Sequence, residues 1–277
     1  MLNDLDVEPE SESELKNALL DNLIRDFSIP QRVSLTNEEE FCLLQGERFA
    51  HYHDGIRLAC WHFGFGPEVV LVHGWNSRGA NMWRFVTPLV SAGYSVTVFD
   101  APAHGESKGS RTSPVHFADA LRTLCGYLGN VHAVVGHSLG SAASLIAFRD
   151  GLQVNTSVHL AGPSSMSAVA CKQLAAVNAP YETRRQYLEW IQDFTNQSVL
   201  DADLPSLTGG LRHPGLILHD RADRVVPFKA SEALNGAWPQ STFVPVEGLG
   251  HRQLITDAQV ISRCVAFIRA AGRATQT

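Results

Sequence analysis

Apolar and polar residues change their spacing along the chain, and these changes predict where helices and strands lie. Between residues 15 and 27, apolar side chains recur every three or four positions, which is typical of one amphipathic helix. A capping box over residues 11–14 precedes this helix, and Pro30 follows it. We expect the helix to pack against the body of the protein, with binding to a separate partner as the alternative.

The spacing then becomes that of a β-hairpin. Polar and apolar residues alternate over 48–53 and again over 56–62, and Asp54-Gly55 between them suits a tight turn. The chain is therefore predicted to enter its sheet through an antiparallel pair of strands.

Beyond the hairpin, short apolar runs alternate with longer helical patterns. The predicted strands are 68–72, 95–99, 132–135, 156–160, 215–218 and 242–246. The predicted helices are 80–92, 114–128, 139–150, 228–237 and 255–270. Strands that are apolar throughout are typical of a parallel sheet with helices on both faces. The fold class is thus α/β, with a doubly wound, mostly parallel sheet and an antiparallel hairpin at its N-terminal end.

One interval between predicted strands is longer than the others. Residues 163–212 contain enough apolar side chains to form a small helical insertion, which we interpret as a lid. The predicted organisation is an acidic tail and helical extension over 1–47, one α/β domain over 48–270 that includes the insertion, and a short tail over 271–277.

The charge of the chain is unevenly distributed. There are 22 Lys and Arg against 28 Asp and Glu, a net charge of −6, and all six surplus acids precede Lys16. No basic patch points to nucleic acid or to a membrane surface. The acidic start does not resemble a secretory signal, and no apolar run reaches the roughly 18 residues of a membrane span. We therefore expect a cytoplasmic protein whose five cysteines are reduced.

The strongest chemical motif is Gly-His-Ser-Leu-Gly at 136–140, between a predicted buried strand and an Ala-rich helix. Small residues on both sides allow a tight strand-to-helix turn, which exposes Ser138 at the carboxyl edge of the sheet. We predict that Ser138 is a nucleophile.

A serine nucleophile needs a base and an acid that orients the base. His251 follows the last predicted strand on a loop bounded by glycines, and we predict that it is the base. The loop after the preceding strand offers two acids, of which we prefer Asp223 to Asp220. Asp100, at the end of another strand, is a weaker reserve.

Acyl transfer also needs donors for an oxyanion. One is the backbone amide of Leu139 at the helix start, and the second is expected from the amide of Trp75, which follows the glycine of His-Gly-Trp at 73–75. The side chains of His73, His104 and His137 are expected to shape the loops around the site.

Together these segments resemble the ordered motifs of the α/β-hydrolase superfamily over about residues 48–270. The segments that carry the resemblance are His-Gly-Trp at 73–75, Phe-Asp-Ala-Pro-Ala-His-Gly-Glu-Ser at 99–107, Gly-His-Ser-Leu-Gly at 136–140, the Asp223 loop and Gly-His at 250–251. His-Gly-Trp combined with Ser-Leu-Gly is similar to the carboxylesterase branch. Ala103 and Asp220 stand where the family often has glycine, and residues 1–47 match nothing in its pattern.

The resemblance implies a Ser-His-Asp hydrolase that cleaves a small-molecule carboxylic ester through an acyl-enzyme and needs neither cofactor nor metal. The same triad would serve a thioesterase or a lactone, amide or C–C bond hydrolase. A ligand-binding protein without turnover is a further alternative, and so is a metal site at His51 and His53 on the hairpin. The sequence specifies neither the acyl group nor the oligomeric state.

Overall fold

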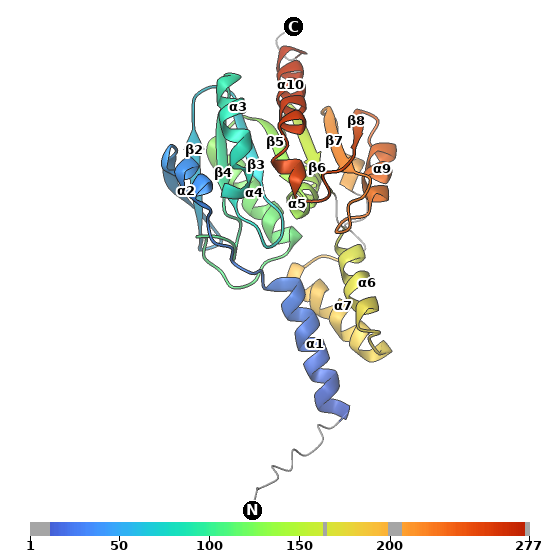
Figure 1. Cartoon of the computed structure of the whole chain (residues 1–277). Coiled ribbons are helices and arrows are strands. Elements are labelled where there is room, and N and C mark those ends of the chain that lie inside the picture. Colours follow the sequence, from blue (N-terminus) through green and yellow to red (C-terminus); the bar gives the residue numbers. More distant parts are fainter. Residues whose placement is uncertain (1–11, 163–164, 199–206, 275–277) are drawn as a thin grey trace, which may run out of the picture.

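The computed structural model describes residues 12–162, 165–198 and 207–274, and these residues form one α/β sheet with helices around it (Figure 1). The sheet has eight strands in the order β1-β2-β4-β3-β5-β6-β7-β8. Their bounds are β1 Glu47–His53, β2 Ile56–Phe63, β3 Glu68–Val72, β4 Ser95–Phe99, β5 Val131–His137, β6 Thr156–Leu160, β7 Gly215–Asp220 and β8 Ser241–Val246. Strand β2 is antiparallel to β1 and β4, and β3 to β8 pair in parallel. The predicted sheet and hairpin are confirmed.

Helices cover both faces of the sheet, as the apolar strands predicted. On one face lie a 3₁₀ helix, Gly79–Phe85, with α3 (Val86–Ser91) and α10 (Ala258–Ala274). On the other face lie α4 (Pro114–Leu128), α5 (Leu139–Arg149) and α9 (Phe228–Ala237). Every residue of β3 to β7 is buried between these layers, whereas the edge strand β8 is half-exposed.

Two helix boundaries differ from the prediction for local reasons. The helix expected over 80–92 is split, because Pro88 has no N–H and cannot bond to the carbonyl four residues earlier. The last helix begins at Ala258 rather than at residue 255, because the carboxylate of Asp257 accepts hydrogen bonds from the amides of Gln259 and Val260.

One helix was not predicted. Helix α2 (Asn37–Leu44) precedes the hairpin and starts with a capping box between Thr36 and Glu39. The Thr-x-x-Glu spacing was visible in the sequence, but the helix is short and only Glu39 and Leu43 are buried in it.

The N-terminal helix packs against the insertion between β6 and β7. Helix α1 (Glu12–Ser28) lies beside α6 (Met166–Ala176) and α7 (Tyr181–Thr195), below the sheet in Figure 1. A third apolar cluster joins these helices, separate from the two on the faces of the sheet. Its buried members are Leu23, Phe27, Val115, Met166, Ala170, Leu174, Ala179, Tyr187 and Ile191. The expectation that α1 packs against the protein is confirmed, whereas its predicted capping box lies largely outside the described residues.

Among the described residues, none of the helices combines the length and the hydropathy of a membrane span. All five cysteines are free thiols, as expected.

Candidate active site

The turn between β5 and α5 holds Ser138 in a strained conformation. Its φ of 54° and ψ of −118° are rare for a residue with a side chain. The turn is tight. A Cβ on Gly136 would lie 2.7 Å from the carbonyl oxygen of Gly140, and a Cβ on Gly140 would collide with the carbonyl oxygen of Val72. Only glycine fits at both positions, which is the reason the sequence pattern suggested.

Three predicted site residues from separate loops form one line of hydrogen bonds. His251, after β8, has Nε2 3.0 Å from Oγ of Ser138, and its Nδ1 lies 2.7 Å from Oδ2 of Asp223, after β7. Because a carboxylate only accepts, Nδ1 carries a proton and Nε2 is left to accept the serine proton. This geometry suits proton transfer from the hydroxyl to the imidazole.

The environment of Asp223 keeps its carboxylate charged. Oδ1 accepts hydrogen bonds from the amides of Val225 and Val226 at 2.7 and 3.0 Å, and Oδ2 faces the imidazoles of His251 and His219. Burial by itself raises the pKa of Asp223, but these hydrogen bonds together bring the pKa well below its usual value.

Asp220, the alternative acid, has another role. Its Oδ1 accepts from the amide of Ala222 at 2.7 Å, and its Oδ2 accepts from the amide of Leu249 at 2.6 Å. The carboxylate is buried, which disfavours its charge, but bonds to backbone amides lower its pKa below the usual value. Asp220 caps its own loop, and it also ties that loop to the one that carries His251.

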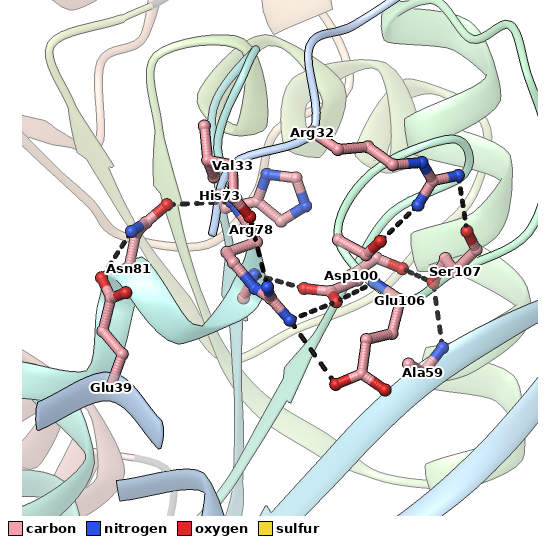
Figure 2. Close-up of polar contacts among 12 residues, drawn as sticks. Arg32, Val33, Glu39, Ala59, His73, Arg78, Asn81, Asp100, Glu106 and Ser107 are labelled. Carbon is pink, nitrogen blue, oxygen red and sulfur yellow. Dashed lines mark hydrogen bonds and ion pairs between the residues drawn. The ribbon is translucent and has the colours of Figure 1, made fainter. Parts of the chain in front are cut away.

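Asp100, the reserve acid, is fully buried and occupied by other groups (Figure 2). Oδ1 accepts from the amide of Gly79 at 2.8 Å, and Oδ2 accepts from the amide of Glu106 at 2.7 Å. Nη2 of Arg78 lies 3.5 Å from the same Oδ2. Burial raises the pKa of Asp100, although Arg78 and the amides oppose this effect. Its contacts hold together the loops that follow β3 and β4.

The loop that contains Trp75 lies directly beside the serine. A Cβ on Gly74 would lie 3.2 Å from Cβ of Ser138, so the absence of a side chain permits this approach. Neither the amide of Trp75 nor that of Leu139 hydrogen-bonds to another described residue. Leu139 is the first residue of α5, where helical amides lack an internal partner. Both amides are therefore available as donors.

A segment that the sequence did not associate with the site crosses these loops. The amide of Gln31 donates to Oδ1 of Asn76 at 2.8 Å, next to Trp75. Arg32 donates to three carbonyl oxygens of the neighbouring loop, those of Gly105, Ser107 and Gly109, and its bond to the Ser107 oxygen is drawn in Figure 2. A single exposed arginine in an unmatched region offered no sequence signal for this contact.

The three histidines around the site make loop-shaping contacts. His73 donates through Nδ1 to the carbonyl of Gly74 and accepts through Nε2 from the amide of Ala101, and His137 donates from Nε2 to the carbonyl of His251 at 3.0 Å. Burial lowers the pKa of His73 far below its usual value, and lowers those of His104 and His137 to about 4. These imidazoles are therefore neutral at neutral pH.

The suggested metal site on the hairpin has no support in the part of the chain that the structure describes. There, no group of three or more His, Cys, Asp or Glu side chains is arranged to hold a metal ion. His51 instead contacts Oγ1 of Thr123 at 3.2 Å, and His53 lies 3.6 Å from Asp54.

A sharp serine turn in a mostly parallel sheet, with the histidine and the aspartate on later loops, defines a class of hydrolases. A model of the alpha/beta hydrolase family matches residues 69–263, and the chain belongs to this family. Over 206 residues it is 31% identical to the 2-hydroxy-6-oxononadienedioate/2-hydroxy-6-oxononatrienedioate hydrolase of Cupriavidus pinatubonensis, covering 68% of this chain and 70% of that protein.

Other relatives carry esterase names. The chain is 24% identical to the pimeloyl-(acyl-carrier protein) methyl ester esterase of Aeromonas hydrophila, over 71% of this chain and 93% of that protein. An esterase of Pyrococcus furiosus superposes with a TM-score of 0.66 at 18% identity, over 88% of this chain and 98% of that one. At this identity the superposition shows the shared fold alone.

Proposed function

We propose that this hydrolase is a serine esterase that cleaves a small-molecule carboxylic ester through an acyl-enzyme. The observation that carries the proposal is the line of hydrogen bonds from Ser138 through His251 to Asp223, at 3.0 and 2.7 Å. Ser138 is the nucleophile, His251 the base and Asp223 the group that orients the base.

The reaction has two halves. Oγ of Ser138 attacks the ester carbonyl while Nε2 of His251 takes the hydroxyl proton, and the same nitrogen returns that proton to the leaving alkoxide. Water, deprotonated by His251, then attacks the acyl-serine, and the proton returns to Ser138 as the carboxylic acid leaves. Asp223 stabilises the imidazolium in both halves.

The negative charge that develops on the carbonyl oxygen needs fixed donors. We assign this role to the amides of Trp75 and Leu139, which are free of other described partners and border the serine. The α5 N-terminus, where Leu139 lies, adds a favourable potential for an anion.

The insertion that contains α6 and α7 serves as the lid. It starts after Gly162, where a Cβ would lie 3.0 Å from the carbonyl oxygen of Ser138, so it leaves the sheet at the nucleophile. Most of its buried apolar residues belong to the cluster that it shares with α1.

A second candidate is hydrolysis of a C–C bond by the same triad. The 31% identity to a hydrolase named for 2-hydroxy-6-oxo acids favours this candidate over thioester, lactone or amide cleavage. The methyl ester esterase name of the Aeromonas hydrophila relative favours the ester.

The replacement of Ser138 tests the proposal. We expect Ser138→Ala to lower kcat for short p-nitrophenyl esters by about 10⁴-fold or more while the midpoint of thermal unfolding changes little. Ser91→Ala, at an exposed serine that ends α3, is the matched control and should remain active. A fluorophosphonate should label the wild type and the control but not Ser138→Ala.

Full turnover by Ser138→Ala would refute the nucleophile assignment. Side-by-side rates for p-nitrophenyl esters, acyl thioesters and a 2-hydroxy-6-oxodienoate then separate the candidates. A clear preference for the dienoate would replace the ester by the C–C bond.

A further inference from the structure

A second histidine contacts the carboxylate of the proposed triad. His219 lies near the end of β7, and its side chain is fully buried. Its Nε2 is 3.1 Å from Oδ2 of Asp223, the same oxygen that accepts from Nδ1 of His251 at 2.7 Å. One carboxylate oxygen thus lies between two imidazoles.

The partners of His219 define the proton on Nε2. Besides Asp223, this nitrogen lies 3.1 Å from the carbonyl oxygen of Val226. Both partners only accept hydrogen bonds, so Nε2 carries a proton and donates. A lone pair at this nitrogen would face two buried acceptors, which is unfavourable.

The other ring nitrogen is anchored as well. Nδ1 of His219 lies 2.7 Å from Oγ of Ser231 on α9, and the same hydroxyl oxygen lies 2.5 Å from the carbonyl oxygen of Gly162. The ring of Phe228 packs edge-on against the imidazole at 5.7 Å between centroids. With both nitrogens and one side held, the imidazole cannot turn away from the carboxylate.

A carboxylate can rotate, and either of its two oxygens can then accept the hydrogen bond from the base. The amides of Val225 and Val226 hold Oδ1 of Asp223, and His219 supplies a fixed donor for Oδ2. The hydrogen bond from His219 is also the largest single effect that lowers the pKa of Asp223. Both effects favour a charged carboxylate with one fixed orientation.

We infer that His219 is a positioning residue of the proposed esterase site, which holds the Asp223 carboxylate in the orientation that aligns His251 with Ser138. The inference rests on the proposed function, because a positioning role has meaning only where the triad works. His219 itself does not touch the reacting atoms and acts through Asp223.

The test replaces the donor and then restores part of it. His219→Phe removes the N–H and should lower kcat about 10- to 100-fold, the range typical of residues that orient a reactive group, with KM nearly unchanged. His219→Gln keeps an amide N–H near the position of Nε2 and should recover part of the loss. His213→Gln is the matched control, since His213 is a partly buried imidazole that contacts Ser157 rather than the triad.

A double-mutant cycle separates positioning from general damage to the fold. In a His251→Ala background, His219→Phe should not slow the fluorophosphonate labelling of Ser138 any further, because its effect passes through His251. If His219→Phe fails to fold, Ser231→Ala takes its place in the test. Ser231→Ala leaves the imidazole but removes its anchor, and it should also lower kcat.

A kcat of His219→Phe equal to that of the wild type would overturn the inference. So would an equal slowing of the labelling rate by His219→Phe with His251 present and in the His251→Ala background. The proposed function has its own criterion: if Ser138→Ala retains full turnover, the triad fails whatever His219 does. If Ser138→Ala is inactive and His219→Phe is fully active, only the role of His219 fails.

Discussion

At the scale of residues, two aspartates three positions apart differ in what binds their oxygens. Backbone amides occupy both oxygens of Asp220, whereas Asp223 keeps one oxygen for imidazoles. The sequence could favour Asp223 from its place in the loop, but the hydrogen bonds give each aspartate a distinct part.

The role of Asp220 can be tested by Asp220→Ala. This change leaves the amides of Ala222 and Leu249 without their acceptor and should cost about 1–3 kcal/mol in the free energy of unfolding. Urea denaturation at pH 7 measures this cost, and kcat should also fall because the loop before His251 is released. Asp193→Ala, at an exposed position on α7, should change neither.

The cost should depend on pH with a defined sign. Since folding lowers the pKa of Asp220, its stabilisation is complete above the unfolded-state value near 3.9 and is lost as the pH falls further. Wild type and variant should therefore converge in acid. A difference that stays constant down to the lowest pH at which the protein folds would contradict this account.

At the scale of elements, α1 and the β6–β7 insertion share one apolar cluster. Phe27 is 5% exposed and meets the rings of Tyr187 and Trp190 edge-on at 6.2 and 6.4 Å. These two aromatic residues of the insertion thus contact the N-terminal helix. The extension is therefore attached to the proposed lid.

Phe27→Ala tests this attachment. Removal of a buried aromatic ring should cost about 3–5 kcal/mol, because the cavity between α1 and α7 cannot close fully. Leu15→Ala on the same helix is the control, since Leu15 is 54% exposed and should contribute little. Chemical denaturation compares the two, and equal small losses would show that α1 does not pack as described.

At the scale of the whole molecule, buried neutral histidines connect stability to pH. His159 is fully buried between Oγ atoms of Ser141 and Ser157, and burial lowers its pKa to about 3. Burial also lowers the pKa values of His104 and His137 to about 4. In the unfolded chain all three would titrate near 6.5, so acid favours unfolding.

We expect the free energy of unfolding to fall as the pH decreases from 7 to 5. With these pKa values, each of the three histidines removes about 2 kcal/mol of stability by pH 5. His159→Gln cannot bind the proton and should flatten the profile by about 1 kcal/mol per pH unit between pH 6 and 5. Urea titrations at several pH values measure both slopes, and unchanged slopes in the variant would contradict the assignment.

Local patterns in the sequence determined much of the fold and the candidate site. The boundaries of β3, β4, β6, α4 and α9 match the prediction because burial on both faces, turn residues and caps are encoded within a few residues of each element. The turn at Ser138 was predictable for the same reason, since its glycines are demanded by contacts within the turn and with the adjacent strand.

Tertiary structure alone decided which distant groups meet. An apolar stripe at helical spacing shows that α1 buries one face, but only the packed structure shows that the face meets α7. The contacts of Gln31 with Asn76 and of Asp220 with Leu249 join residues 45 and 29 positions apart. Hydrogen bonds of this kind depend on orientation in three dimensions, which residue spacing does not encode. The sequence therefore determined the nature of the site, and the packing determined the groups that hold it in place.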